Sequence, residues 1–161
     1  MSAVPIAIAD AITTILNNAV QAESFESLTA IENNSLVVSR SYPDWDDDFK
    51  DLKSLAVDVV FVSSGSSGGD LVELDSEGSL TTDPAIDVAV RYRFEPTERN
   101  PRLENESVDR LVNLVEEIYE KLAAARNTAI SITGTSANWI DVSVKTYCDY
   151  KRLREGVFLG V

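Results

Sequence analysis

Five consecutive residues contain the densest group of carboxylates in the sequence, and carboxylates at this spacing could bind a metal ion. The group consists of Asp44, Trp45, Asp46, Asp47 and Asp48. Its first, third and fifth residues match the first three ligand positions of a calcium-binding loop. Such a loop needs glycine at its sixth position and a bidentate glutamate at its twelfth, where this chain has Phe49 and Leu55. The pattern excludes an EF-hand and favours a solvated acidic turn.

A glycine-rich segment, Ser63 to Gly69, has some of the composition of a phosphate-binding loop. No Gly-Lys-Ser or Gly-Lys-Thr follows its glycines, and the next residue is Asp70, whose carboxylate would repel phosphate. The composition instead predicts a flexible loop. Because the residues up to Pro84 are mostly polar, we expect a long mobile hairpin arm at about residues 63–84.

Basic residues occur at two places where they could form ion pairs. Arg91 and Arg93 lie on the polar face of a predicted strand, where cross-strand pairing with Asp58 or Asp141 is favoured over contact with another subunit. A small basic island precedes the last predicted strand and contains Lys151, Arg152 and Arg154. The island is either a solvated turn or, in an oligomer, a counterpart for the acidic residues 44–48 of an adjacent copy.

The composition removes several classes of enzyme. The chain has no histidine, which excludes Ser-His-Asp and Cys-His catalysis and removes the commonest metal ligand. A single cysteine, Cys148, can form neither an internal disulfide nor a multi-cysteine zinc site. We therefore expect no catalytic residues, no bound metal and no cofactor.

The net charge of −13 argues against tight binding of nucleic acid, because Lys and Arg supply most of the affinity for its phosphates. An acidic surface would instead let DNA pass without adhering. The first five residues lack the basic start of a signal peptide, and no apolar run approaches the roughly 18 residues of a membrane span. We expect a soluble protein, made in the cytoplasm, with no membrane partner.

Two amphipathic helices are expected from apolar residues spaced three and four apart. The first covers Pro5 to Val20, and the second runs from about Val108 to Ala125 with Ser107 as its N-cap. The charged, proline-containing segment Glu95 to Glu106 between them is expected to be a solvated connection. A further one or two helical turns are expected at Asp44 to Leu52.

Strands are expected where apolar residues run together or alternate. A hairpin is expected across Leu28 to Ser41, a central strand at Leu55 to Val62, and an alternating strand from Ile86 to Phe94. Trp139 to Tyr147 alternates again, and a last strand, Val157 to Val161, ends inside an apolar run. We expect that this strand completes itself on a neighbouring molecule or that a natural tail is missing.

At 161 residues the chain has the length of a single domain. The order of the expected elements has no βαβ regularity and no internal repeat. It predicts an α+β fold: a mostly antiparallel sheet, two amphipathic helices packed on one face, and the long hairpin arm.

The sequence resembles the tail terminator, or tail completion, proteins in the neck of long-tailed bacteriophages. The resemblance covers most of the chain. It is carried by the opening helix Ile6 to Val20, by Arg40-Ser41-Tyr42-Pro43 with the acidic stretch and Asp51 to Val57 after it, by the strand Ile86 to Phe94 with the helix Leu111 to Leu122, and by Asp149 to Phe158.

The resemblance implies a structural virion protein without catalytic residues. Its members form a hexameric ring that caps the tail tube, stops tube polymerisation and meets the head-side connector or stopper protein. The implied partners are therefore other copies of the chain, the tail tube protein and the connector, while DNA slides through the lumen without specific binding. The implied location is the neck of the virion, after assembly in the host cytoplasm.

Two alternatives stay open. One is another component of the head-tail junction, a head completion protein or a tail tube subunit. The other is a metal-dependent nuclease or other hydrolase with Asp44, Asp46, Asp48 and Asp58 as ligands, which would need carboxylates brought together from different strands.

Overall fold

The structure is a computed structural model, and it describes residues 4–31, 36–41, 52, 55–62, 73–74, 80–81, 85–94, 101–125, 130–132, 135–137 and 142–161. The helices are α1 Val4–Gln21, α2 Glu26–Ile31, α3 Pro101–Ala125 and α4 Tyr150–Arg154. The strands are β1 Val38–Arg40, β2 Ala56–Val62, β3 Glu73–Leu74, β4 Leu80–Thr81, β5 Ala85–Arg93, β6 Ile130–Ile132, β7 Thr135–Ala137 and β8 Val157–Gly160.

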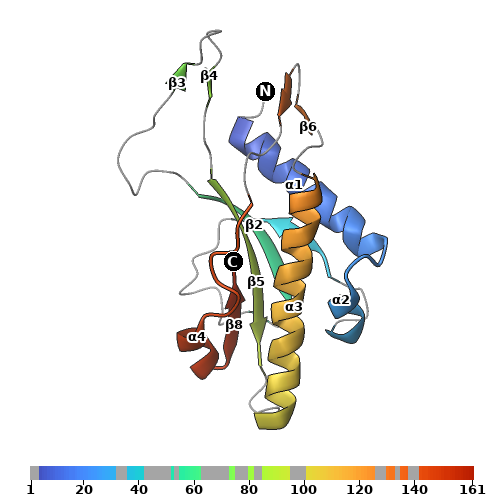
Figure 1. The fold of residues 1–161 in the computed structure, drawn as a ribbon, viewed down its shortest axis with the longest axis vertical. Helices are drawn as coiled ribbons and strands as arrows, with labels where there is room; N and C mark the ends of the chain where they lie inside the picture. The colour runs from blue at the N-terminus through green and yellow to red at the C-terminus, as the bar shows by residue number, and fades with distance from the viewer. Residues whose placement is uncertain are drawn as a thin grey trace.

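A four-stranded sheet in the order β1-β2-β5-β8 forms the centre of the fold (Figure 1). The pairs β2–β5 and β5–β8 are antiparallel, whereas β1 runs parallel to β2. The expected α+β fold is confirmed, and the sheet is mixed. The strands expected at 55–62, 86–94 and 157–161 correspond to β2, β5 and β8.

Helices α1 and α3 share one hydrophobic core with this sheet. Figure 1 shows α3 running lengthwise beside β5, with α1 inclined to it. The largest fully buried side chains of the core are Leu16, Leu28, Val57, Val59, Val90, Leu111, Leu114 and Phe158. The apolar stripes expected on both long helices therefore supply the side chains that cover the sheet.

The hairpin expected across Leu28 to Ser41 is wrong. Residues 26–31 form helix α2, because burying Phe25 and Leu28 in the core holds this short segment against α3. Among the described residues no strand precedes β1, and it joins β2 in parallel, with Val38 opposite Val57.

The expected start of the second long helix is also wrong. α3 begins at Pro101, so part of the segment expected as a connection is helical and Ser107 lies inside the helix rather than capping it. Proline is well tolerated in the first turn, where its missing N–H would have no intrahelical partner. The helix is therefore almost two turns longer at its N-terminal end than expected.

The strand expected at Trp139 to Tyr147 is not found in its described part, residues 142–147. These residues belong to no strand, and the short helix α4 follows them unexpectedly. Gly156 then joins α4 to β8 with φ of 83°, a conformation that a glycine adopts without strain.

Two small ladders lie apart from the main sheet. β3 pairs with β4 and β6 pairs with β7, both antiparallel. Figure 1 shows β3 and β4 far from β8, and the rest of the expected arm at residues 63–84 lies outside the described residues. In the described part of the chain, none of the helices combines the length and apolar character that a membrane crossing requires.

Candidate functional site

A buried ion pair joins β2 to β5 on the sheet face opposite the long helices. Arg91 donates from Nε and Nη2 to Asp58 Oδ2, at 2.8 and 2.7 Å. The hydroxyl of Ser41 donates to Asp58 Oδ1 at 2.8 Å. Asp58 and Arg91 are only 5% and 7% exposed. The expected cross-strand pairing of Arg91 with Asp58 is confirmed, while Arg93 is exposed at the end of the same strand.

This arrangement bears on the nuclease alternative. Both carboxylate oxygens of Asp58 accept hydrogen bonds from neighbouring side chains, so a metal ion would have to displace Arg91 or Ser41. Asp44, Asp46, Asp47 and Asp48 lie outside the described residues. Among the residues that the structure does describe, no group of three or more acidic, cysteine or histidine side chains is arranged to hold a metal ion.

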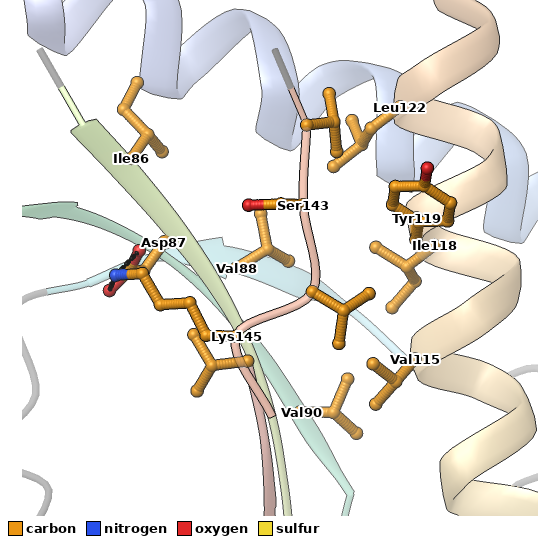
Figure 2. Close-up of a pocket in the computed structure, with 13 residues that line it drawn as sticks. Ile86, Asp87, Val88, Val90, Val115, Ile118, Tyr119, Leu122, Ser143 and Lys145 are labelled. Atoms are coloured by element: carbon orange, nitrogen blue, oxygen red, sulfur yellow. Dashed lines mark hydrogen bonds and ion pairs between the residues drawn. The ribbon is translucent and has the colours of Figure 1, made fainter. Parts of the chain in front are cut away.

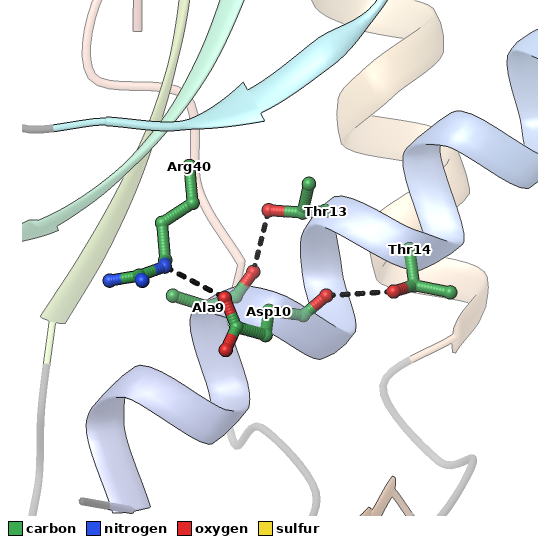
Figure 3. Close-up of polar contacts among 5 residues, drawn as sticks. All are labelled: Ala9, Asp10, Thr13, Thr14 and Arg40. Carbon is green, nitrogen blue, oxygen red and sulfur yellow. Dashed lines mark hydrogen bonds and ion pairs between the residues drawn. The ribbon is translucent and has the colours of Figure 1, made fainter. Parts of the chain in front are cut away.

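The outer edge of β1 is covered by helix α1. The side-chain amide of Asn17 donates to the carbonyl oxygen of Val38 at 2.8 Å and accepts from its N–H at 2.9 Å. Figure 3 shows a second link between the same elements, in which Arg40 Nε lies 2.7 Å from Asp10 Oδ1. An asparagine at this position satisfies the backbone groups that an edge strand would otherwise present to another chain.

The outer edge of β8 is covered by residues 145–149. Val161 and Thr146 exchange two backbone hydrogen bonds of 2.9 and 3.0 Å, and the N–H of Asp149 donates to Leu159 at 2.9 Å. The last strand is thus completed by the chain's own residues, contrary to the expectation that it is completed on a neighbour. Both outer strands of the described sheet have backbone groups already engaged, which disfavours assembly by strand addition there.

Helix α4 presents the basic island to solvent. Asp149 caps it by accepting from the N–H groups of Lys151 and Arg152 at 3.0 and 3.3 Å. Leu153 packs against the core. On the outer side, Lys151 and Arg154 are exposed, and Tyr150 is 74% exposed.

Tyr147, which precedes α4, connects this region to α3. Its hydroxyl donates to Glu116 Oε2 at 2.5 Å. This hydrogen bond is the main reason that the pKa of Tyr147 is raised above its ordinary value, with desolvation and the negative charge of Glu116 adding to it. The interaction favours the neutral phenol and fixes the segment before α4 against the long helix.

A second surface, of opposite charge, lies between α2 and α3. It is a hollow of about 420 Å³ lined by Glu26, Ser27, Arg110, Asn113, Glu116, Glu117 and Glu120. The N-terminal end of α2 is held there by Glu117, which accepts from the hydroxyl of Ser27 at 2.8 Å and from its N–H at 3.3 Å. Four glutamates against one arginine make the hollow acidic, and we call it the acidic groove.

An apolar pocket of about 230 Å³ lies between α3, β5 and residues 142–145. Figure 2 shows Val90, Val115 and Ile118 at its apolar wall. Lys145 closes one end by contacting Asp87 at 2.6 Å. The pocket can accept a small apolar group, since most of the side chains that line it are apolar.

No protein-family model, curated protein or solved structure matches this chain. Of the residues singled out in the sequence, the structure pairs Arg91 with Asp58 and groups Lys151 and Arg154 on one exposed surface. Asn17, Tyr147 and Tyr150 were not expected from the sequence. Of these, only Tyr147 and Tyr150 could have been singled out as candidate interface residues, because they lie beside the basic island and Tyr and Arg are enriched in protein interfaces.

Proposed function

We propose that this protein is a structural subunit of the neck of a long-tailed bacteriophage. It forms a ring that caps the tail tube, stops tube polymerisation and joins the tail to the head-side connector. Its partners are other copies of itself, the tail tube protein and the connector, and DNA passes through the ring without specific binding.

One observation carries this proposal. The described segments that resemble tail terminator proteins lie in one connected scaffold: α1, β5, α3 and the α4–β8 unit all contribute to the same core. Segments far apart in the sequence that carry the resemblance are therefore packed together, and this supports the proposal because a shared fold would require it. The closed sheet edges add support, because a ring subunit must associate in a controlled way rather than by open-ended strand pairing.

The finer features of the fold belong to the same proposal. The mainly antiparallel sheet carries the two long helices on one face, and residues 63–84 form an arm that becomes ordered on the tail. The separation of the β3–β4 ladder from the four-stranded sheet supports an arm that projects from the domain. The net charge of −13 supports a lumen that DNA does not adhere to.

The test is to produce virions that lack this protein. We expect tails of uncontrolled length that fail to attach to filled heads, and restoration of both properties when the protein is supplied. Tails of normal, fixed length that still carry heads would contradict the proposal. In a second assay, the purified protein is added to polymerising tail tube protein, where it should stop elongation, whereas a tube subunit would itself form long cylinders.

A further inference from the structure

The exposed side of α4 has the composition of a docking surface. Tyr150, Lys151 and Arg154 lie within about one third of the helix circumference, since residues three and four apart share a side. All three are exposed, while Leu153 of the same short helix packs against the core. An exposed tyrosine beside two cations is typical of the residues that dominate binding energy at interfaces.

The nearby carboxylate of Asp149 does not cancel this basic character. It is engaged locally, since it caps α4 and lies 3.8 Å from Arg152 Nε. Lys151 and Arg154 therefore project their charge outward from a chain whose net charge is −13. A partner that these side chains attract must be acidic, and the chain itself offers an acidic surface.

The acidic groove has the complementary charge. Glu120 and Glu26 are exposed at the groove, which is a shallow, open depression. A tyrosine side chain can lie across such a depression while its basic neighbours face the glutamates.

The two surfaces lie on different sides of α3. Figure 1 shows α4 on one side of α3 and α2 on the other, so one copy cannot bring its own α4 into its own groove. A contact between α4 of one copy and the groove of the next is heterologous, and repeated contacts of this kind produce closed rings or filaments.

We propose that copies of this protein associate head to tail, with Tyr150, Lys151 and Arg154 of one subunit docked in the acidic groove between α2 and α3 of the next. This inference rests on the proposed neck ring and identifies the contact that builds it. Charge attraction sets the register of neighbouring subunits, and the tyrosine packs against the open groove.

The test uses two matched pairs of charge reversals in the full-length protein. Arg154→Glu alters the docking side and Lys121→Glu is its control on α3. Glu120→Lys alters the groove and Glu106→Lys is its control, at a position on α3 outside the groove. Light scattering over a range of protein and salt concentrations measures self-association, and circular dichroism verifies folding.

We expect Arg154→Glu and Glu120→Lys each to raise the concentration needed for association at least about tenfold, while both controls associate as the wild type does. An equimolar mixture of the two interface variants should associate almost as well as the wild type. In that mixture one contact pairs the reversed charges and the next is native, so alternating subunits can assemble. Association of the wild type should weaken as salt screens the charges.

Wild-type behaviour of either interface variant, or failure of the mixture to recover, would overturn the inference. So would a wild-type protein that stays monomeric at every concentration. These outcomes are distinct from failure of the proposed function. Rings that survive both variants would remove this contact but leave the neck ring intact, whereas subunits that join through this contact yet never stop tube elongation would remove the neck function alone.

Discussion

Asp58 and Arg91 form their buried ion pair although they do not face each other across the sheet. Asp58 lies opposite Ala89, and Arg91 lies opposite Ala56. The pair is therefore diagonal, and the long arginine side chain spans the offset. Ala89 also packs with Leu159 in a small apolar cluster on this face. The face opposite the helices thus combines an ion pair with apolar contacts.

The first prediction concerns this ion pair. Arg91→Met removes the cation but leaves the Asp58 carboxylate buried, and we expect a loss of about 3–5 kcal/mol in the free energy of unfolding. The double variant Asp58→Val/Arg91→Met should recover much of that loss, because it leaves no charge buried alone. Urea unfolding measures both.

Arg93→Met is the matched control on the same strand. Because Arg93 is exposed, its replacement should change the free energy of unfolding by no more than about 0.5 kcal/mol. Equal losses at Arg91 and Arg93 would show that the diagonal pair does not stabilise the sheet.

The long elements could be predicted because their patterns are local. Ile86, Val88 and Val90 alternate on one face of β5, and the apolar stripe of α3 repeats at helical spacing. The Arg91–Asp58 ion pair could be predicted for the same reason. Both residues lie on the polar faces of strands that the apolar pattern identified.

The elements that were missed depend on contacts between distant residues. By composition, the β-branched residues Thr29 and Ile31 favour a strand. The segment forms helix α2 instead, because Phe25 and Leu28 are buried in the core. Asn17 and Val38 are 21 residues apart, so an asparagine near a helix end gave no sign that it covers a strand edge. Glu117 likewise binds Ser27, 90 residues away.

The second prediction concerns the edge of β1. Asn17→Ala removes both hydrogen bonds to Val38 and leaves its backbone groups with poorer partners, so we expect a loss of about 1–3 kcal/mol in the free energy of unfolding. The exposed edge should also increase aggregation. Asn18→Ala, at the exposed neighbouring position, is the control and should do neither. Thermal unfolding with light scattering detects both effects, and identical behaviour of the two variants would contradict the edge-covering role.

The third prediction concerns a close approach between β8 and α3. A Cβ at Gly160 would lie 2.5 Å from Val115 Cγ2 and 3.0 Å from the carbonyl oxygen of Tyr147. Gly160→Ala should therefore cost about 1–3 kcal/mol through overpacking. In the double variant Gly160→Ala/Val115→Ala, the cost should be less than the sum of the single costs, because the shorter side chain relieves the clash. Strict additivity in denaturant unfolding would argue against this contact.

The fourth prediction concerns pH. The pKa of Tyr147 is raised in the folded protein, so its bond to Glu116 stabilises the fold below the unfolded pKa of 10.0, and this contribution is lost as pH rises through the higher folded value. Tyr147→Phe should remove the tyrosinate absorbance that Tyr147 contributes above pH 10.0, together with this part of the alkaline loss of stability. A spectrophotometric titration in which Tyr147→Phe retains it would refute the assignment.

The most direct measurement of the central claim is the mass and shape of the purified protein's assemblies, by light scattering and negative-stain imaging across protein concentrations. The neck-ring account predicts closed rings of uniform diameter, consistent with about six subunits joined by a repeated heterologous contact. Long cylinders without closed rings would contradict it and would identify a tail tube subunit instead.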